Sequence, residues 1–393
     1  MLAAVVLLAA SAGLKAASLG PWEVNRLLSP PALEWGARNG LTQEVCYEGE
    51  PLGGRPTRVF AYYGRPAEGA GPFPAVLLVH GGGGRAFREW AEHWAGRGYV
   101  ALAMDLSGNG PQGRLADGGP NQDDDTKFRA FTDADVGEMW TYHAVAAVLR
   151  GHGLLLAQPE VNPRQIGVTG ISWGGYVACI VAGVDPFLAA AVPVYGCGFL
   201  HENSVWRESR FEKMPAELRD RWVRWFDPSQ YLPDARGPIL FLNGSNDFAY
   251  PLDSYRKSFE LVRGNKTLSV VLNLPHGHIW TFPEVDAFVD AAMGRAEPFP
   301  RLEARPAPDG HLRARLSDAR NPVQAWLHFS TDEGPWQNRR WQSTSALRRG
   351  ATVEAKLPVE RPIVAFLAIQ DGRGLRVSAP HVELPAPTVE GEP

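Results

Sequence analysis

The chain has 393 residues, more than a single domain usually contains, so we expect one large domain and a smaller one. Its hydrophobic content of 45% and charged content of 21% are ordinary for a globular protein. The formal net charge of -4 gives no reason to expect binding to nucleic acid or to an acidic membrane surface. The three cysteines, Cys46, Cys179 and Cys197, lack the close spacing of a zinc site or a disulfide framework.

The first residues contain an apolar stretch, Leu2 to Ala10, that is too short to cross a bilayer. Small residues follow it, with a possible cleavage site after Ala12 or Ala17, as in a secretory signal peptide. No Lys or Arg precedes the apolar run, and a short apolar N-terminal helix is the alternative. We expect residues 1–17 to be a signal peptide, the protein to be periplasmic or secreted, and the mature chain to have no membrane span.

Residues 18–297 are expected to form an α/β domain, because strand and helix patterns alternate from about residue 55 onward. This alternation predicts a doubly wound, mostly parallel sheet with helices on both faces. The predicted strands are Thr57–Tyr63, Pro74–His80, Tyr99–Leu106, Gln165–Gly170, Ala189–Tyr195, Pro238–Asn243 and Leu268–Leu274. The predicted helices are Gly137–Gly151, with Gly151 as the stop, Gly175–Ala182, Leu252–Arg263 and Glu284–Met293.

Two segments interrupt this alternation. Gly108–Asp135 is rich in Gly, Asp, Asn and Pro and is predicted to be a long loop. Phe199–Asp227 follows a strand and is predicted to be a cap over an active site. Its indoles, which suit the flat faces of sugars, make Trp206, Trp222 and Trp225 candidate substrate-binding residues. The alternative is an amphipathic helix whose tryptophans pack on the core and whose arginines are solvated.

Residues 309–384 show short alternating segments separated by turn residues, which predicts an antiparallel β-sandwich of immunoglobulin-like type. The proline-containing segment Glu297–Pro308 is the expected link, and residues 385–393 the expected tail. We expect this domain to be a structural buttress, while Trp336 and Trp341 keep a carbohydrate-contacting role open.

The segment from Gly170 to Gly174, with Ser172 at its centre, matches the G-x-S-x-G nucleophile elbow. An acyl-transfer serine also needs backbone donors for the oxyanion. The apolar run from Val76 ends in His80 and four glycines, so Gly82 or Gly83, together with the N–H of Trp173, are the candidate donors. A phosphate-binding loop is the alternative, but no G-K-[ST] follows, and His80 is expected to hold the loop in place.

The acid and base should follow the serine in the order Ser, Asp, His. Asp247 comes just after a predicted strand and is preferred over Asp253 and Asp227 as the acid. Two histidines, His276 and His278, lie in the loop after the last predicted strand. We prefer His278 as the base because its greater distance from the strand end lets the ring reach the serine, and His276 is the alternative. A metal site from the two histidines lacks a third ligand of matching spacing.

These residues resemble the α/β-hydrolase superfamily over about residues 50 to 295. The stretches GISWGGY and HGGGG resemble the dienelactone hydrolase, acetyl xylan esterase and prolyl-oligopeptidase-like group. The resemblance implies a triad of Ser172, Asp247 and one of the two histidines, with no metal and no cofactor. It also implies a substrate range from sugar acetates and other carboxylic esters to peptides. Residues 1 to 50 are too short for the β-propeller of the peptidase branch, which favours an esterase.

We therefore expect a serine carboxylic-ester hydrolase, acting on a small-molecule or polysaccharide ester such as acetylated xylan. A serine peptidase of the same fold is the second possibility. A catalytically idle binding or scaffold protein is the third, because a fold alone does not prove activity.

Overall fold

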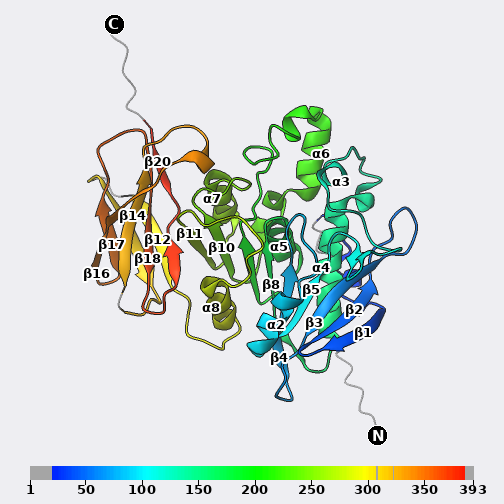
Figure 1. The fold of residues 1–393 in the computed structure, drawn as a ribbon. Helices are drawn as coiled ribbons and strands as arrows, with labels where there is room; N and C mark the ends of the chain where they lie inside the picture. The colour runs from blue at the N-terminus through cyan, green and yellow to red at the C-terminus, as the bar shows by residue number, and fades with distance from the viewer. Residues whose placement is uncertain (1–19, 307–308, 322, 386–393) are drawn as a thin grey trace, which may run out of the picture.

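The computed structural model describes residues 20–306, 309–321 and 323–385, so the predicted signal peptide and nearly all of the predicted tail lie outside the described residues. Figure 1 shows an α/β unit, coloured from blue to yellow-green, beside an all-β unit coloured from yellow to red. Both features agree with the predicted fold class.

The α/β unit is built on a twisted sheet whose parallel part runs from β5 to β11. An antiparallel meander, β1 to β3, extends one edge and pairs with β5. In spatial order the strands are β1 (Leu33–Asn39), β2 (Thr42–Glu48), β3 (Arg58–Gly64), β5 (Val100–Met104), β4 (Phe73–Val79), β8 (Val161–Ile171), β9 (Ala190–Val194), β10 (Ile239–Gly244) and β11 (Lys266–Val271).

Helices cover both faces of this sheet. A bond from His93 to Asp286 joins the two helices of one face, α2 (Arg88–Gly96) and α8 (Pro283–Ala292). The other face carries α4 (Trp140–Leu156), α5 (Trp173–Val184) and α7 (Leu252–Leu261), with α1 (Val24–Leu27) against α4. Every predicted strand and helix of this unit is present, whereas β1, β2 and α2 were not predicted.

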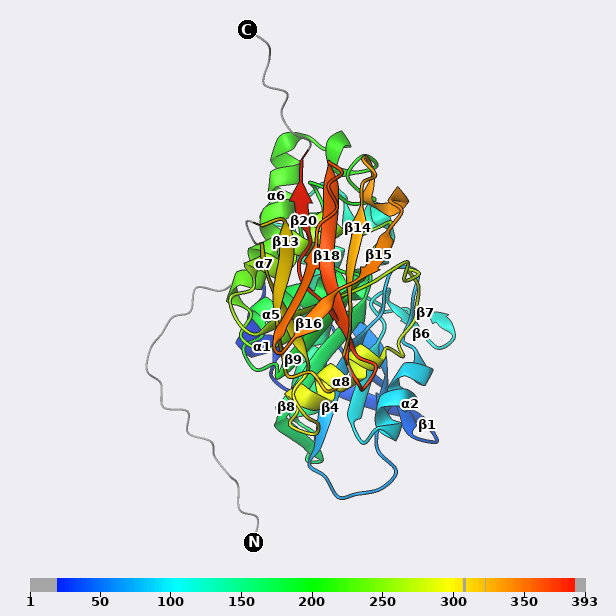
Figure 2. The ribbon, with the colours of Figure 1, turned by 90° about the vertical axis from the view of Figure 1, so that its left-hand side faces the viewer.

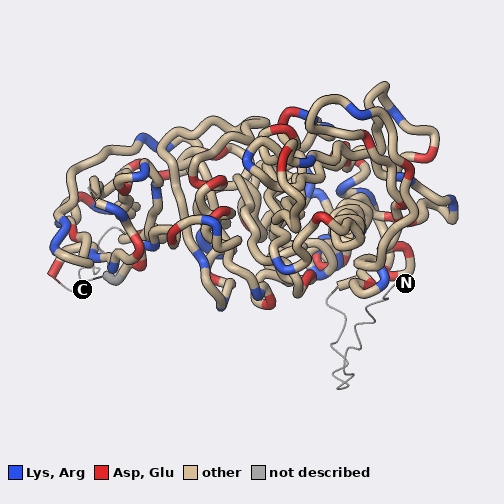
Figure 3. The backbone as a smooth tube through the Cα atoms, turned by 90° about the horizontal axis from the view of Figure 1, so that it is seen from below, with Lys and Arg blue, Asp and Glu red and all other residues tan. Residues whose placement is uncertain are grey.

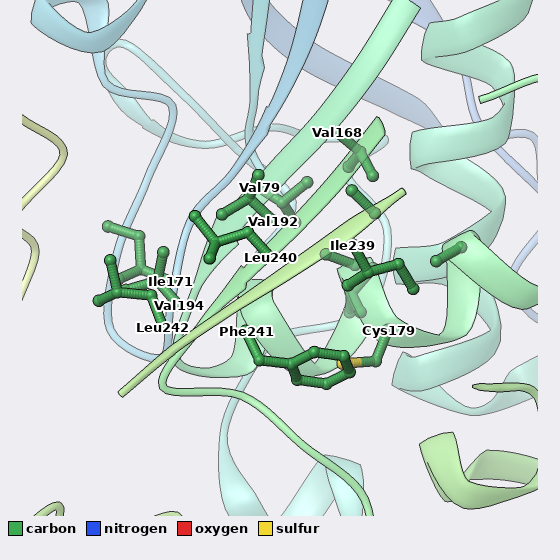
Figure 4. Close-up of a cluster of buried hydrophobic side chains, with 14 of the residues drawn as sticks. Val79, Val168, Ile171, Cys179, Val192, Val194, Ile239, Leu240, Phe241 and Leu242 are labelled. Atoms are coloured by element: carbon green, nitrogen blue, oxygen red, sulfur yellow. The ribbon is translucent and has the colours of Figure 1, made fainter. Parts of the chain in front are cut away.

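Strand alternation divides the core between the two faces. In Figure 4, Phe241 of β10 and Cys179 of α5 point toward each other, while Leu240 and Leu242 lie on the opposite face of the strand. Leu242 pairs in register with Val194, which pairs with Ile171. All these side chains are buried, as expected for strands covered on both sides.

Helix α4 continues past Gly151, the predicted stop, to Leu156. A side chain at Gly151 would contact the Leu102 methyl group at 3.0 Å, and one at Gly153 would meet the backbone oxygens of Leu28 and Ser29 at 2.7 and 2.8 Å. These glycines therefore allow close packing within the helix and do not end it.

The insertions contain short regular elements. The first holds a hairpin, β6 (Asn109–Gly110) with β7 (Gly113–Arg114), and helix α3 (Asp124–Lys127). The second holds η2 (Phe211–Lys213) and α6 (Ala216–Phe226). In Figure 1, α3 and α6 lie side by side at the top of the α/β unit. The other 3₁₀ turns are η1 (Val136–Glu138), η3 (Pro228–Gln230), η4 (Leu232–Asp234) and η5 (Trp336–Asn338).

The C-terminal unit consists of two antiparallel layers, seen face-on in Figure 2. One layer is β12 (Arg301–Pro306), β13 (His311–Ser317), β17 (Thr352–Lys356) and β16 (Leu347–Arg349). The other is β19 (Arg376–Ser378), β18 (Ile363–Gln370), β14 (Gln324–Ser330) and β15 (Gln342–Ser345), with β20 (Val382–Leu384) on β18. The first strand, β12, lies within the segment predicted as the link, so the sandwich begins earlier than expected.

The two units share one sheet. Strand β19 pairs antiparallel with β11 at Leu268 and Ser378, and the Ser378 hydroxyl accepts a bond from the Val270 N–H at 3.1 Å. The sheet of the α/β unit thus continues into the sandwich. Figure 3 shows acidic and basic residues interspersed along both units. Among the described residues, no helix is long and apolar enough to cross a membrane.

Candidate active site

Ser172 lies on the sharp turn between β8 and α5. Its φ of 56° and ψ of -120° are uncommon for a residue with a side chain, and they match the strained turn of a nucleophile elbow. The Ser172 N–H donates to the Val194 carbonyl at 2.9 Å, which fixes the turn to β9. Every residue of α5 is buried, whereas Ser172 at its start is partly exposed.

The glycines of the motif have a steric reason. A side chain at Gly174 would collide with the Val79 carbonyl, and one at Gly170 would collide with the Gly174 carbonyl. The elbow therefore packs against the ends of β4 and β8 with no room for a Cβ atom, which supports the reading of this segment as an elbow rather than a chance match.

Asp247 follows β10, and its carboxylate is held on both oxygens. Oδ1 accepts the N–H groups of Ala249 and Tyr250 at 2.9 and 2.7 Å. Oδ2 accepts a hydrogen bond from Nδ1 of His276 at 2.7 Å. The Asp247 side chain is fully buried and that of His276 is 13% exposed, so the imidazole is the member of this pair that reaches toward solvent.

This pairing favours His276, the alternative base, over the preferred His278. The physical reason is the length of the last strand, because β11 ends at Val271 and not at Leu274. The loop therefore begins earlier than predicted, and His276 already reaches the acid. His278 continues past it to the glycine loop, where its Nε2 lies 3.4 Å from the position of a Cβ on Gly81. Its ring packs on Phe87 at 5.1 Å, and burial lowers the pKa of His278 below its ordinary value.

The glycine loop packs directly on the elbow. A Cβ on Gly81 would lie 3.0 Å from Cβ of Ser172, and one on Gly82 would lie 3.0 Å from Cδ1 of Trp173. Gly83 has a φ of +67° and closes a turn in which the Gly84 N–H donates to the Gly81 carbonyl. Of the predicted oxyanion residues, Gly82 and Trp173 therefore lie together beside Ser172, whereas the Cβ position of Gly83 has no neighbour within 4 Å in the described part of the chain.

His80 anchors this loop, as predicted. Its Nδ1 bonds the Gly81 carbonyl at 2.7 Å, and its Nε2 accepts the Leu106 N–H at 2.8 Å. The ring therefore carries its proton on Nδ1. Burial lowers the pKa of His80 to about 4, so it remains neutral near pH 7.

The two competing aspartates have local roles. Asp227 accepts the N–H groups of Phe199, Leu200 and Ser229, which fixes both ends of the cap segment. Asp253, in the first turn of α7, accepts a bond from the Asn203 side chain at 2.9 Å. These contacts do not bring the carboxylate of Asp227 or of Asp253 to a histidine.

The three cap tryptophans differ in position. The Trp206 ring lies 4.5 Å from that of Trp173, directly beside the elbow. Trp222 is fully buried, stacks on Phe128 at 5.4 Å and donates its N–H to the Lys127 carbonyl. Trp225 donates its indole N–H to Asp133 at 2.7 Å. Of the three, Trp206 is the one whose ring contacts a residue of the elbow. All three join the cap to the first insertion, Trp206 through its indole N–H, which donates to Asp124 at 3.2 Å.

Two tyrosines at this site were not singled out from the sequence. The Tyr195 hydroxyl donates to the Gly277 carbonyl at 3.1 Å, and its ring lies 4.6 Å from that of His276. Tyr250 is also near this histidine, with its ring centre 6.3 Å from that of His276 and nearly parallel to it, at an angle of 9°. Nothing in the residue spacing indicates that these rings flank the histidine; only the position of Tyr250 just after Asp247 gave a hint.

Known proteins resemble this chain over the α/β unit. The model of the dienelactone hydrolase family matches residues 59–292, which is more than half of the chain. A Methylorubrum extorquens protein provisionally named a carboxymethylenebutenolidase is 27% identical over 257 residues, covering 64% of this chain and 74% of that protein. The acetyl esterase Axe7A of Xylanibacter ruminicola is 25% identical, covering 58% of this chain and 54% of its own length.

Among solved structures, acetyl xylan esterase 1 from Thermoanaerobacterium sp. JW/SL YS485 has a TM-score of 0.56 and 19% identity, covering 69% of this chain and 92% of that one. At this identity the likeness concerns the fold. The family match, which spans Ser172, Asp247 and both histidines, concerns the sequence itself. The chain belongs to the dienelactone hydrolase family and is a hydrolase of the α/β-hydrolase group.

Proposed function

We propose that this protein is a serine carboxylic-ester hydrolase with Ser172 as nucleophile, His276 as general base and Asp247 as the acid that orients the base. The observation that carries the proposal is the Asp247–His276 hydrogen bond, formed between the loops that follow β10 and β11. Ser172 follows β8 in the same parallel sheet. The carboxyl ends of parallel strands meet at one edge of a sheet, where α/β enzymes hold their active sites.

The chemistry follows from these positions. His276 takes the proton of the Ser172 hydroxyl as its oxygen attacks the ester carbonyl, and Asp247 stabilises the imidazolium that forms. The proton then passes to the leaving alcohol, which departs and leaves an acyl-enzyme. A water molecule, activated in the same way by His276, releases the acid and restores Ser172.

The developing negative charge needs donors that are fixed before the reaction. In this proposal they are the N–H groups of Trp173 and of Gly82 or Gly83. The close packing of the glycine loop on the elbow supports this assignment. His80 stabilises the loop through its hydrogen bonds with the Gly81 carbonyl and the Leu106 N–H.

For the substrate we propose a carbohydrate acetyl ester, of which acetylated xylan is the first to test. The names of the acetyl esterase and acetyl xylan esterase relatives support this choice. Trp206, beside the elbow, is the proposed contact for a sugar ring. We include in the proposal a secreted or periplasmic protein, from the signal-peptide pattern of residues 1–17.

The test compares two substrates. The protein should hydrolyse p-nitrophenyl acetate and release acetate from acetylated xylan, whereas a chromogenic peptide amide should remain intact. Cleavage of the peptide with no acetate release would favour a serine peptidase instead. No turnover of either, with Ser172 unreactive toward a fluorophosphonate, would leave a binding or scaffold role.

A further inference from the structure

Tyr250 carries a hydroxyl group that has no hydrogen-bond partner among the residues that the structure describes. The side chain is fully buried, so solvent does not satisfy the group either. Buried hydroxyl groups are almost always paired, because an unpaired one loses its bond to water without replacement. The exception therefore needs a reason.

The position of this residue is set by the catalytic acid itself. The Tyr250 N–H donates to Oδ1 of Asp247 at 2.7 Å, and its carbonyl accepts a bond from the Asn243 side chain at 2.8 Å. The ring is confined between His276, on which it stacks, and Trp206, whose ring centre lies 5.4 Å away. The ring is thus packed on both of these aromatic neighbours.

Three residues of the proposed site therefore surround this phenol: Ser172, His276 and Trp206. Burial raises the pKa of Tyr250 well above its ordinary value. The Ser172 side chain lies close enough to the phenol to lower this pKa, as the smallest of the contributions, but forms no well-aligned hydrogen bond with it. The hydroxyl consequently keeps its proton at any working pH and is available as a donor. A fixed donor without a partner, next to the nucleophile, is suited to a group that is present only during the reaction.

We propose that the Tyr250 hydroxyl donates a hydrogen bond to an oxygen of the tetrahedral intermediate that forms on Ser172. This inference rests on the proposed function and adds a side-chain donor to the backbone donors of the glycine loop. Because the free enzyme leaves the donor unpaired, the bond stabilises the intermediate and not the resting state. Such an interaction raises the rate of acylation and does not merely tighten substrate binding.

The test compares two Tyr→Phe variants, each of which removes one buried hydroxyl group. Tyr255 is equally buried, but its hydroxyl lies 2.7 Å from the Leu242 carbonyl and 2.9 Å from the Pro193 carbonyl. In Tyr250→Phe, kcat/KM for p-nitrophenyl acetate should fall about 10²- to 10³-fold, as when a single oxyanion donor is removed elsewhere. Its melting temperature should stay the same or rise. Tyr255→Phe should show the reverse, with a lower melting temperature and unchanged kcat/KM.

Inhibition by a boronic acid is a second measurement, because a boronic acid forms a tetrahedral adduct with serine that resembles the intermediate. Its inhibition constant should rise in Tyr250→Phe by a factor similar to the fall in kcat/KM, and should not change in Tyr255→Phe. If the wild-type protein is an active, Ser172-dependent esterase and Tyr250→Phe retains kcat/KM within twofold, the role of Tyr250 is overturned and the proposed function stands. If the wild type neither turns over esters nor binds the boronic acid, both fall together.

Discussion

Nδ1 of His276 lies 2.7 Å from Oδ2 of Asp247, whose other oxygen is already occupied by two backbone N–H groups. A carboxylate only accepts hydrogen bonds, so Nδ1 carries the proton and Nε2 is left free to accept one. That is the tautomer a general base requires. The relationship between these two residues therefore supports the proposal of His276, rather than His278, as the base.

We expect His276→Ala to lose nearly all esterase activity, because it removes the ring that Asp247 orients. His278→Ala should keep most of it, since His278 contacts the glycine loop and Phe87. The comparison measures turnover of p-nitrophenyl acetate by the two purified variants. An unchanged melting temperature of each variant is the control for folding. An inactive His278→Ala beside an active His276→Ala would reverse the assignment.

Asp247→Asn should lower kcat by about 10³- to 10⁴-fold, since an amide in this position disfavours the required tautomer of the histidine. The matched control is Asp253→Asn, which changes an aspartate nearby in sequence that binds only the Asn203 side chain in this region. The control should retain wild-type kcat. Equal activity of the two variants would remove Asp247 from the proposed triad.

Trp206→Ala should raise KM for acetylated xylan and leave p-nitrophenyl acetate hydrolysis nearly unchanged, because Trp206 lies beside the elbow where a sugar would extend. Trp222→Ala is the control within the same segment. It removes a fully buried indole and should cost about 3–5 kcal/mol of stability without a selective effect on either substrate. A parallel change in KM for both substrates in Trp206→Ala would make the cap a packing element only.

Stability should fall as the pH is lowered from about 6.5 to 4. Burial lowers the pKa of His80, His143 and His328 to about 4, so each folded ring resists the proton that the unfolded chain takes up from about pH 6.5 downward. Asp105 acts in the opposite sense, because burial raises its pKa to about 6. Smaller shifts of both kinds accompany these, with the pKa of His278 and His381 lowered and that of Glu284 and Asp286 raised. The three large histidine shifts outweigh the one large aspartate shift, and the net loss should be at least about 1 kcal/mol.

Urea unfolding at pH 7.5 and 4.5 measures this loss. Asp105→Asn removes the opposing group and keeps an acceptor for the Ser107 and Asn109 N–H groups, so its stability should fall more steeply with acid than that of the wild type. A free energy of unfolding that rises toward pH 4.5 would contradict the account.

The parallel sheet could be predicted from the sequence, because strands that are buried on both faces are continuous apolar runs, such as Pro74–His80. It missed β1 and β2, of which β1 is largely exposed and therefore carries little apolar pattern. It also took Gly151 as a helix end, although the glycine serves close packing against β5. These elements depend on tertiary contacts, which a local sequence pattern does not reveal.

The candidate site also has residues that the sequence predicted and residues that it did not. Ser172 and Asp247 were predicted from motif and order, since each sits at a strand end that the sequence marks. The choice between His276 and His278 depended on where β11 stops, and strand boundaries are the part of a pattern with least physical signal. The role of Tyr250 depends on which rings meet in space, and no spacing along the chain encodes that.

The most direct measurement is active-site labelling with a fluorophosphonate, followed by peptide mass spectrometry, together with p-nitrophenyl acetate turnover of Ser172→Ala. We predict a single adduct on Ser172 in the native protein, none after unfolding, and a fall in turnover on the order of 10⁶-fold in the folded variant. An adduct on another residue, or a folded Ser172→Ala that keeps more than about a tenth of the wild-type rate, would contradict the proposal that Ser172 is the nucleophile.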